Sequence, residues 1–135
     1  MKHLFTLFFV SVLALAATAQ QAPEQKPTGP FMKFEKTSHD FGDISHGDKV
    51  THIFKFTNTG NEPVIITNIA VQCGCTAPKW PRDPVPPGAS ADIVISFDST
   101  GKSGKQNKVV TIISNASNQN NTLTITTNIL AKDTK

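Results

Sequence analysis

Short runs of alternating apolar and polar residues, separated by turn residues, dominate the chain after residue 30. Within residues 50–57, Val50, His52, Phe54 and Phe56 have the same parity, so their side chains share one face of an extended strand. Similar alternation recurs over 91–97 and 122–130, and Gly, Pro and Asn close the runs. Beyond residue 19, no window repeats apolar residues with the period of a helix. About seven short strands of this kind predict an all-β domain, a β-sandwich with antiparallel sheets.

Two places in this strand pattern carry more specific expectations. The run Val64–Val71 is densely β-branched, but its apolar residues do not keep one parity. We therefore expect burial on both faces or a bulge near Thr67 and Asn68. Residues 58–61, which precede this run, are expected to form a turn in which Gly60 or Asn61 is able to take a positive φ. Phe31 and Phe34 are the expected apolar anchors at the start of the domain.

The first 19 residues have the three-part pattern of a secretory signal peptide. A short basic start precedes the apolar run Leu4–Ala16, and the small residues Ala17–Ala19 follow. This run is too short for a comfortable membrane span, which needs about 20 apolar residues. We expect cleavage after Ala19, a periplasmic or secreted protein, and no stable membrane span once the signal is removed.

The remaining chain divides by composition into three parts. Residues 20–30 contain three prolines and no large apolar side chain, which predicts a flexible, extended leader. The folded domain is expected over 31–131, with a polar tail at 132–135.

Charge and motif content exclude several classes of function. The formal net charge is +3, and the lysines are scattered rather than gathered in a basic stripe with aromatics, so nucleic-acid binding is not expected. There is no carboxylate dyad, Gly-x-Ser-x-Gly motif or Gly-rich phosphate loop. We therefore predict no catalytic residue, no cofactor and no metal ligand set, and expect that the protein is not an enzyme.

One stretch, Gln72–Gly88, differs from the rest of the chain. It holds both cysteines, the only tryptophan, the only arginine and five of the nine prolines. Each proline removes a backbone donor and fixes φ, which predicts neither a regular strand nor a helix here. We expect a strand that ends at Cys73 and a proline-stiffened crossover that reaches the next strand at Ala89.

Cys73 and Cys75, separated by Gly74, leave several chemical interpretations open. They could form a local disulfide or a thiol pair that shapes the loop, a redox-active pair, a soft-metal site, or a bond to another chain. Closing so small a ring contributes only about 1.5–2 kcal/mol, so a disulfide here would act locally. The bond requires a tight turn at Gly74, whereas an extended segment would point both thiols to one face.

Trp80 and three histidines are the other candidate site residues. Trp80 lies between two prolines, and its ring is expected either to cover the end of the core or to serve as a rigid anchor for a protein partner. His39, His46 and His52 fall in the first third of the domain. Either one of them meets the cysteines in space, or all three are ordinary surface and turn residues.

Several motifs, taken in order, carry a resemblance to a known family. These are Asn58-Thr59-Gly60, Pro63-Val64, Cys73-Gly74-Cys75-Thr76 and Pro86-Pro87-Gly88. Over residues 34–130 the chain resembles the bacterial exported domain of unknown function fifteen-seventy-three. That family resembles immunoglobulin-like domains of the Hydin and major-sperm-protein type, which are non-catalytic interaction modules. The resemblance implies an immunoglobulin-like antiparallel sandwich of seven to eight strands, and architectural roles for Asn58, Gly60, Cys73, Cys75 and Gly88.

Two functional hypotheses follow. The first is an exported, non-catalytic immunoglobulin-like domain that binds an unknown protein partner or assembles at the cell envelope. The second is an exported thiol module, redox-active or soft-metal-binding, that works through Cys73 and Cys75.

Overall fold

The computed structural model describes residues 21–132, and the predicted signal peptide lies outside them. Eight β-strands account for the fold, and no helix occurs among the described residues. The strands are β1 (Met32–Phe34), β2 (Ser38–Ser45), β3 (Lys49–Asn58), β4 (Ile66–Val71), β5 (Thr76–Lys79), β6 (Ser90–Asp98), β7 (Gly104–Ser114) and β8 (Thr122–Leu130).

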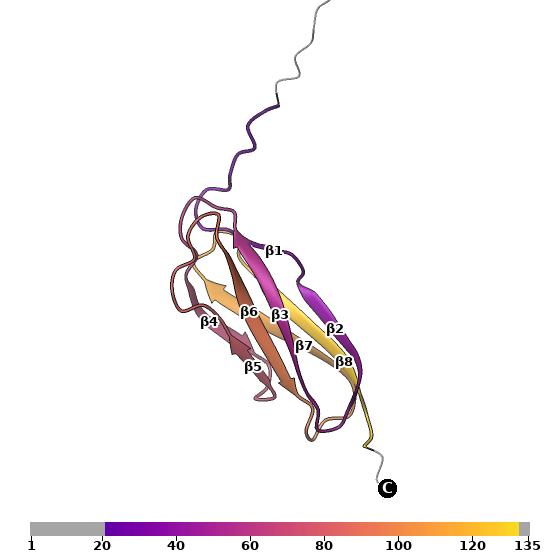
Figure 1. Ribbon diagram of the computed structural model, residues 1–135. Coiled ribbons are helices and arrows are strands. Elements are labelled where there is room, and N and C mark those ends of the chain that lie inside the picture. The colour runs from indigo at the N-terminus through magenta and orange to yellow at the C-terminus, as the bar shows by residue number, and fades with distance from the viewer. Residues whose placement is uncertain (1–20, 133–135) are drawn as a thin grey trace, which may run out of the picture.

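The strands form two four-stranded sheets that pack face to face (Figure 1). One sheet has the order β1-β3-β6-β5 and the other the order β2-β8-β7-β4. The leader from residue 21 leaves one end of the sandwich, and β8 ends near the other (Figure 1). The predicted all-β sandwich is confirmed. The pairs are antiparallel except for β2 and β8, which run parallel with a bulge between Asp40 and Asp43.

The core lies between the sheets, on the faces that the alternating pattern predicted. Phe54 and Phe56 of β3 are 1% and 0% exposed; they lie beside the inward side chains of β6 in the same sheet and share the core with those of β8 in the other sheet. The buried residues of these two strands are Ile93, Ile95, Phe97, Leu123, Ile125, Thr127 and Ile129. Burying each large apolar side chain contributes about 1.5–3 kcal/mol, so these residues together make a large favourable contribution to folding. Of the N-terminal anchors, Phe31 and Phe34 are only half-buried, and Met32 between them occupies the buried position.

A bulge explains the irregular parity of β4, which confirms one of the two alternatives expected for this strand. The pairing of β4 with β7 shifts by one residue between Ile66 and Asn68. The Thr67 hydroxyl donates to the carbonyl oxygen of Ile113 at 3.1 Å, which occupies an acceptor where the ladder is disrupted. The shift lets both Ile66 and Ile69 face the core, and it leaves Ile65 on the surface.

The turn after β3 differs from its prediction. Neither Gly60 nor Asn61 has a positive φ. Gly60 is instead buried against the end of the leader, where a Cβ atom would overlap the carbonyl oxygen of Gly29 and lie 2.8 Å from the nitrogen of Phe31. The residue is therefore required for close approach of two backbones rather than for its φ. Hydrogen bonds between Gly29 and Asn61 hold the leader against this turn.

The expectation that Gln72–Gly88 contains no regular strand is wrong over Thr76–Lys79, which forms β5 at the edge of its sheet. In the β5–β6 ladder, the carbonyl oxygen of Cys75 accepts from the nitrogen of Asp98, so the odd-numbered residues of this stretch bond to β6. The main chain of the even-numbered Pro78 points away from β6. At that position the missing N–H of Pro78 breaks no ladder bond. The flanking strands also end two residues before and begin one residue after the predicted points, at Val71 and Ser90.

Candidate functional site

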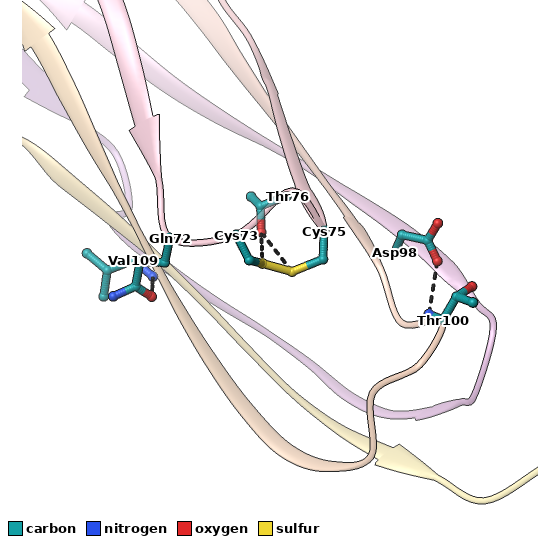
Figure 2. The surroundings of a disulfide bond; sticks show 7 residues. All are labelled: Gln72, Cys73, Cys75, Thr76, Asp98, Thr100 and Val109. Atoms are coloured by element: carbon teal, nitrogen blue, oxygen red, sulfur yellow. Dashed lines mark hydrogen bonds between the residues drawn. A yellow bond between two sulfur atoms is a disulfide. The ribbon is translucent and has the colours of Figure 1, made fainter.

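Cys73 and Cys75 form a disulfide in the loop that carries the chain from one sheet to the other (Figure 2). Their Cα atoms are 5.2 Å apart, because the backbone turns at Gly74. The predicted tight turn is confirmed, and the extended alternative is excluded. Both cysteines are half-buried, whereas Gly74 is exposed with no atom within 4 Å of where a Cβ would lie.

Hydrogen bonds tie this loop to both sheets. On one side, the Gln72 side chain accepts from the backbone nitrogen of Val109 in β7 at 3.1 Å (Figure 2). On the other side, the carbonyl oxygen of Cys75 accepts from Asp98 in β6 at 2.9 Å. The Thr76 hydroxyl lies 3.9 Å from both sulfurs. The disulfide therefore fixes a joint between the two layers rather than a long-range connection.

The C-terminal end of β6 lies next to the disulfide loop. Asp98 accepts a hydrogen bond from the backbone nitrogen of Thr100 at 3.0 Å, and the Lys49 ammonium lies 3.7 Å from its other oxygen. The hydrogen bonds from Thr100, followed by the charge of Lys49, lower the pKa of the Asp98 carboxyl below its ordinary value. Asp98 is therefore ionised at neutral pH, where it caps the turn after β6.

Two of the three histidines meet each other. His39 of β2 and His52 of β3 come from different sheets and stack, with ring centroids 3.6 Å apart and an angle of 8° between the planes. Phe41 and Phe54 contact this pair edge-on. His46 accepts a hydrogen bond from the backbone nitrogen of Gly101. Within residues 21–132, no group of three or more His, Cys, Asp or Glu side chains is arranged to hold a metal ion.

The stack gives His52 a perturbed titration. Partial burial lowers its pKa below the ordinary value of 6.5, and the nearby charges of His39 and Lys36 lower it further. The neutral imidazole is the form that suits a stack against a second ring and two phenylalanines, since protonation would place a charge beside apolar surface.

Trp80 is half-buried, and its ring packs against the hydrophobic core. The Arg82 guanidinium lies over the outer side of the ring, 3.9 Å from its centroid, in a cation–π contact. The indole Nε1 is buried without a hydrogen-bond partner among the described residues. Covering of the core and stacking by Arg82 are therefore the observed contacts of this side chain, and its role as a partner anchor stays a prediction.

Surface isoleucines on the second sheet were missed by the sequence reasoning. Ile65, just before β4, is 42% exposed, and Ile113 of β7 is 46% exposed. They lie near each other, because Ile65 accepts from Asn115 and Ile113 pairs with Asn68. The mixed parity of the Val64–Val71 run was the one available signal, because a strand with apolar residues on both faces presents some of them to solvent.

Residues 32–129 match a family described as "Protein of unknown function (DUF1573)". No curated protein matches the chain. Residues 21–132 contain no helix that is long and apolar enough to cross a membrane.

Solved structures that are similar to this chain include the following three. A protein of unknown function from Porphyromonas gingivalis W83 is 17% identical with a TM-score of 0.62, over 76% of this chain and 48% of that chain. The secreted serine protease VesC from Vibrio cholerae is 19% identical with a TM-score of 0.58, over 77% of this chain and 24% of that chain. The ASH/PapD-like domain of human CEP192 is 10% identical with a TM-score of 0.65, over 95% of this chain and 100% of that chain.

These likenesses establish a shared sandwich fold of the immunoglobulin-like, PapD-like type. The chain spans about half or less of the first two structures, 48% and 24% of their lengths. The protease activity belongs to VesC as a whole protein, and a common fold at such identities carries no activity with it.

Proposed function

The chain belongs to the DUF1573 family of proteins of unknown function, as its motifs predicted, and on that premise we propose that it is an exported, non-catalytic protein-interaction module of the cell envelope. The immunoglobulin-like fold and the family support a non-enzymatic role. The proposed location is the periplasm or the outside of the cell, on the evidence of the signal-like residues 1–19.

The observation that carries this proposal is the neutral apolar surface around Ile65 and Ile113. The two neighbouring isoleucines are each more than 40% exposed and lie in stretches without charged residues, which suits the centre of an interface. The buried polar groups, by contrast, serve the fold. Ser99 donates to the carbonyl oxygens of Ser45 and Asp48, and Thr127 donates to that of Gly42.

Cross-linking in intact cells tests the interaction. The tagged protein is cross-linked, purified under denaturing conditions and analysed by mass spectrometry beside the variants Ile113→Lys and Thr51→Lys. The proposal predicts one recurrent envelope protein in stoichiometric yield, lost in Ile113→Lys and retained in Thr51→Lys, which changes an exposed residue of the other sheet. Absence of any such complex would overturn it, as would substrate turnover by the purified protein.

Export is tested separately by cell fractionation and N-terminal sequencing. The processed protein should be found outside the cytoplasm and begin at Gln20. If the protein is unprocessed and stays in the cytoplasm, the proposed envelope location is wrong, but the proposed interaction role is unaffected.

Thiol exchange at Cys73 and Cys75 is the second candidate. It is favoured by one observation, the placement of the disulfide in a half-exposed loop at the end of the sandwich. Attack by a protein or small-molecule thiolate on one sulfur would form a mixed disulfide and release the other as a thiolate. Equilibration with reduced and oxidised glutathione, followed by alkylation and mass spectrometry, decides between the roles. A bond that stays closed under strongly reducing buffers is structural, whereas one that opens near the poise of exchange catalysts supports this second function.

A further inference from the structure

The two sheets have free edges, and the main-chain groups at those edges are not treated alike. In an antiparallel ladder, alternate residues bond to the neighbouring strand, and the residues between them point their N–H and C=O groups the other way. On an edge strand these outward groups are open to another polypeptide unless something occupies or removes them.

Side chains occupy part of the edges at β1 and β2, and the other outward residue of β1, Phe34, lies between the charged residues Lys33 and Glu35. Met32 is an outward residue of β1, and the Asn118 amide both accepts from its nitrogen and donates to its oxygen, at 3.0 and 2.8 Å. On β2, the Asp40 carboxylate accepts from the nitrogen of Gly42, and the Asp48 carboxylate accepts from that of Ser45. The charges of these aspartates further discourage an approaching strand.

The edge at β5 offers no free donor. Its outward residues are Thr76 and Pro78, because Cys75, of the other parity, bonds to β6. The nitrogen of Thr76 donates to the carbonyl oxygen of Cys73 at 3.3 Å, and Pro78 has no N–H. The Cys-Gly-Cys turn and the proline together therefore leave this edge without an outward donor for strand pairing.

The edge at β4 is open. The nitrogen of Ile112 donates to Asn121 on the β8 side, so the odd-numbered residues of β7 face β4. The register then pairs Asn68 and Ala70 with β7 and turns the N–H and C=O groups of Ile69 and Val71 outward. No residue within 21–132 accepts from or donates to these groups, and β4 pairs with β7 alone.

The strands of its own sheet that lie next to this open edge are largely uncharged, whereas β5 and the crossover carry Lys79, Arg82 and Asp83. Residues 63–78 and 109–131 contain no Asp, Glu, Lys, Arg or His, and together they supply β4, most of β7 and all of β8. The exposed Ile65 immediately precedes β4, and the exposed Ile113 lies on the neighbouring strand β7, opposite Asn68. A neutral strand would thus meet neither repulsion nor an unpaired buried charge on docking.

One other stretch lacks a pairing strand. Strand β1 ends at Phe34 and does not extend along the first half of β3. The N–H and C=O groups of Thr51 and Ile53 therefore also point outward. That stretch is charged, because Lys49 forms an ion pair with Asp98 at one end and Lys55 lies at the other. Natural edge strands carry lysines in such places to prevent pairing. An uncharged strand therefore favours β4 over β3.

We propose that the open edge of β4 binds an extended, uncharged strand of a partner protein through the main-chain groups of Ile69 and Val71. The added strand would place alternate neutral side chains beside the exposed Asn68 and Ala70 of β4 and extend the second sheet to five strands, one more than its present four. This assignment rests on the proposed interaction role and names the surface and the chemical class of the partner.

The probe is the neutral peptide acetyl-Ser-Val-Thr-Ile-Thr-Val-Ser-amide, titrated into the purified protein by calorimetry and followed by NMR. The proposal predicts binding, with the largest shifts at the amides of Ile69 and Val71. N-methylation of one alternate set of peptide residues should weaken binding by about tenfold or more, and N-methylation of the other set should not. The proposal would be overturned if N-methylation weakened binding with both sets or with neither set. It would also be overturned if the largest NMR shifts were centred on Ile53.

Two protein variants complete the test. Val71→Pro removes an outward donor as Pro78 does on β5, and it should abolish peptide binding in a protein whose melting shows that it is folded. If that variant does not fold, Ala70→Lys introduces a charge at an exposed position and should weaken binding by about tenfold or more, while Thr51→Lys should not. Unchanged binding in the folded variants would overturn the proposal.

The same variants separate this proposal from the broader one. A cellular complex that is lost in Ile113→Lys but retained in a folded Val71→Pro would sink the edge assignment and leave the interaction role standing. Absence of any complex would remove the interaction role itself. Self-association of the peptide-free protein that Val71→Pro abolishes would assign the edge to a second copy of this chain, and would overturn a partner strand as its occupant.

Discussion

The side-chain nitrogen of Asn58 lies 2.9 Å from the carbonyl oxygen of Val85, in the middle of the proline-rich crossover. The same amide donates to Glu62, and its oxygen accepts from the nitrogens of Phe31 and Gly60. One buried side chain thus joins the leader, the turn after β3 and the crossover, with each of its polar atoms used. The architectural role implied for Asn58 has a concrete basis in these bonds.

Asn58→Ala should lower the free energy of unfolding by about 3 kcal/mol or more, because it leaves several buried main-chain groups without partners. Urea unfolding measures the loss. Asn61→Ala is the matched control, since its one side-chain bond, to Gly29, is exposed and its loss should cost under about 1 kcal/mol. Equal losses in the two variants would show that burial of the Asn58 network contributes nothing.

Gly60→Ala should destabilise the protein by about 1–3 kcal/mol, because the added methyl group would overlap the backbone of Gly29. Gly74→Ala should change stability by less than about 0.5 kcal/mol, since nothing lies within 4 Å of its Cβ position and its φ is not positive. Thermal melting of the pair checks both. A neutral Gly60→Ala would contradict the close packing of the leader against this turn.

Replacement of both cysteines by serine should reduce stability by about 1.5–2 kcal/mol or less, and the fold should remain, because the disulfide closes a very short loop. Near-ultraviolet circular dichroism and urea unfolding, with and without a reducing agent for the parent protein, provide the measurement. A loss large enough to unfold the domain would mean that the bond stabilises far more than the joint between β4 and β5.

The His39–His52 stack predicts a pH dependence of stability. The folded-state pKa of His52 lies below 6.5, so the unfolded chain takes up the proton first as the pH falls. The contribution of His52 is fully present above pH 6.5 and is lost as the pH falls toward its lowered pKa. His52→Phe should therefore reduce the decline in stability between neutral pH and that lower range, while His46→Gln, outside the stack, should retain it. An identical decline in His52→Phe would contradict this.

The strands and the core were predictable from the sequence because alternation of apolar side chains is a local signal. Phe54, Ile95 and Ile125 could be assigned to the inner face from spacing alone. Even the bulge at Thr67 was visible, since it disturbs the parity of neighbouring isoleucines. Such features depend on residues that are close in sequence.

The features that the sequence did not predict depend on contacts between residues that are distant in sequence. Pro78 is compatible with a strand only because the edge of the sheet is on its outward side, and strand order sets that. Gly60 is required because Gly29 packs on it, and a turn considered alone suggests a positive φ instead. The histidine stack likewise joins β2 and β3 from different sheets, which no spacing rule links. The disulfide between Cys73 and Cys75 was partly predictable. The sequence left its formation open, but it showed that the bond requires a single local turn at Gly74.

Residue-resolved amide hydrogen exchange on the purified protein tests the open edge of β4 most directly. If the edge is open, exchange is slow for the amides of Asn68 and Ala70, which bond to β7, and fast for those of Ile69 and Val71 between and beside them. Protection of Ile69 and Val71 equal to that of their neighbours would show that the edge is already covered, and would contradict the assignment of β4 as the free docking strand.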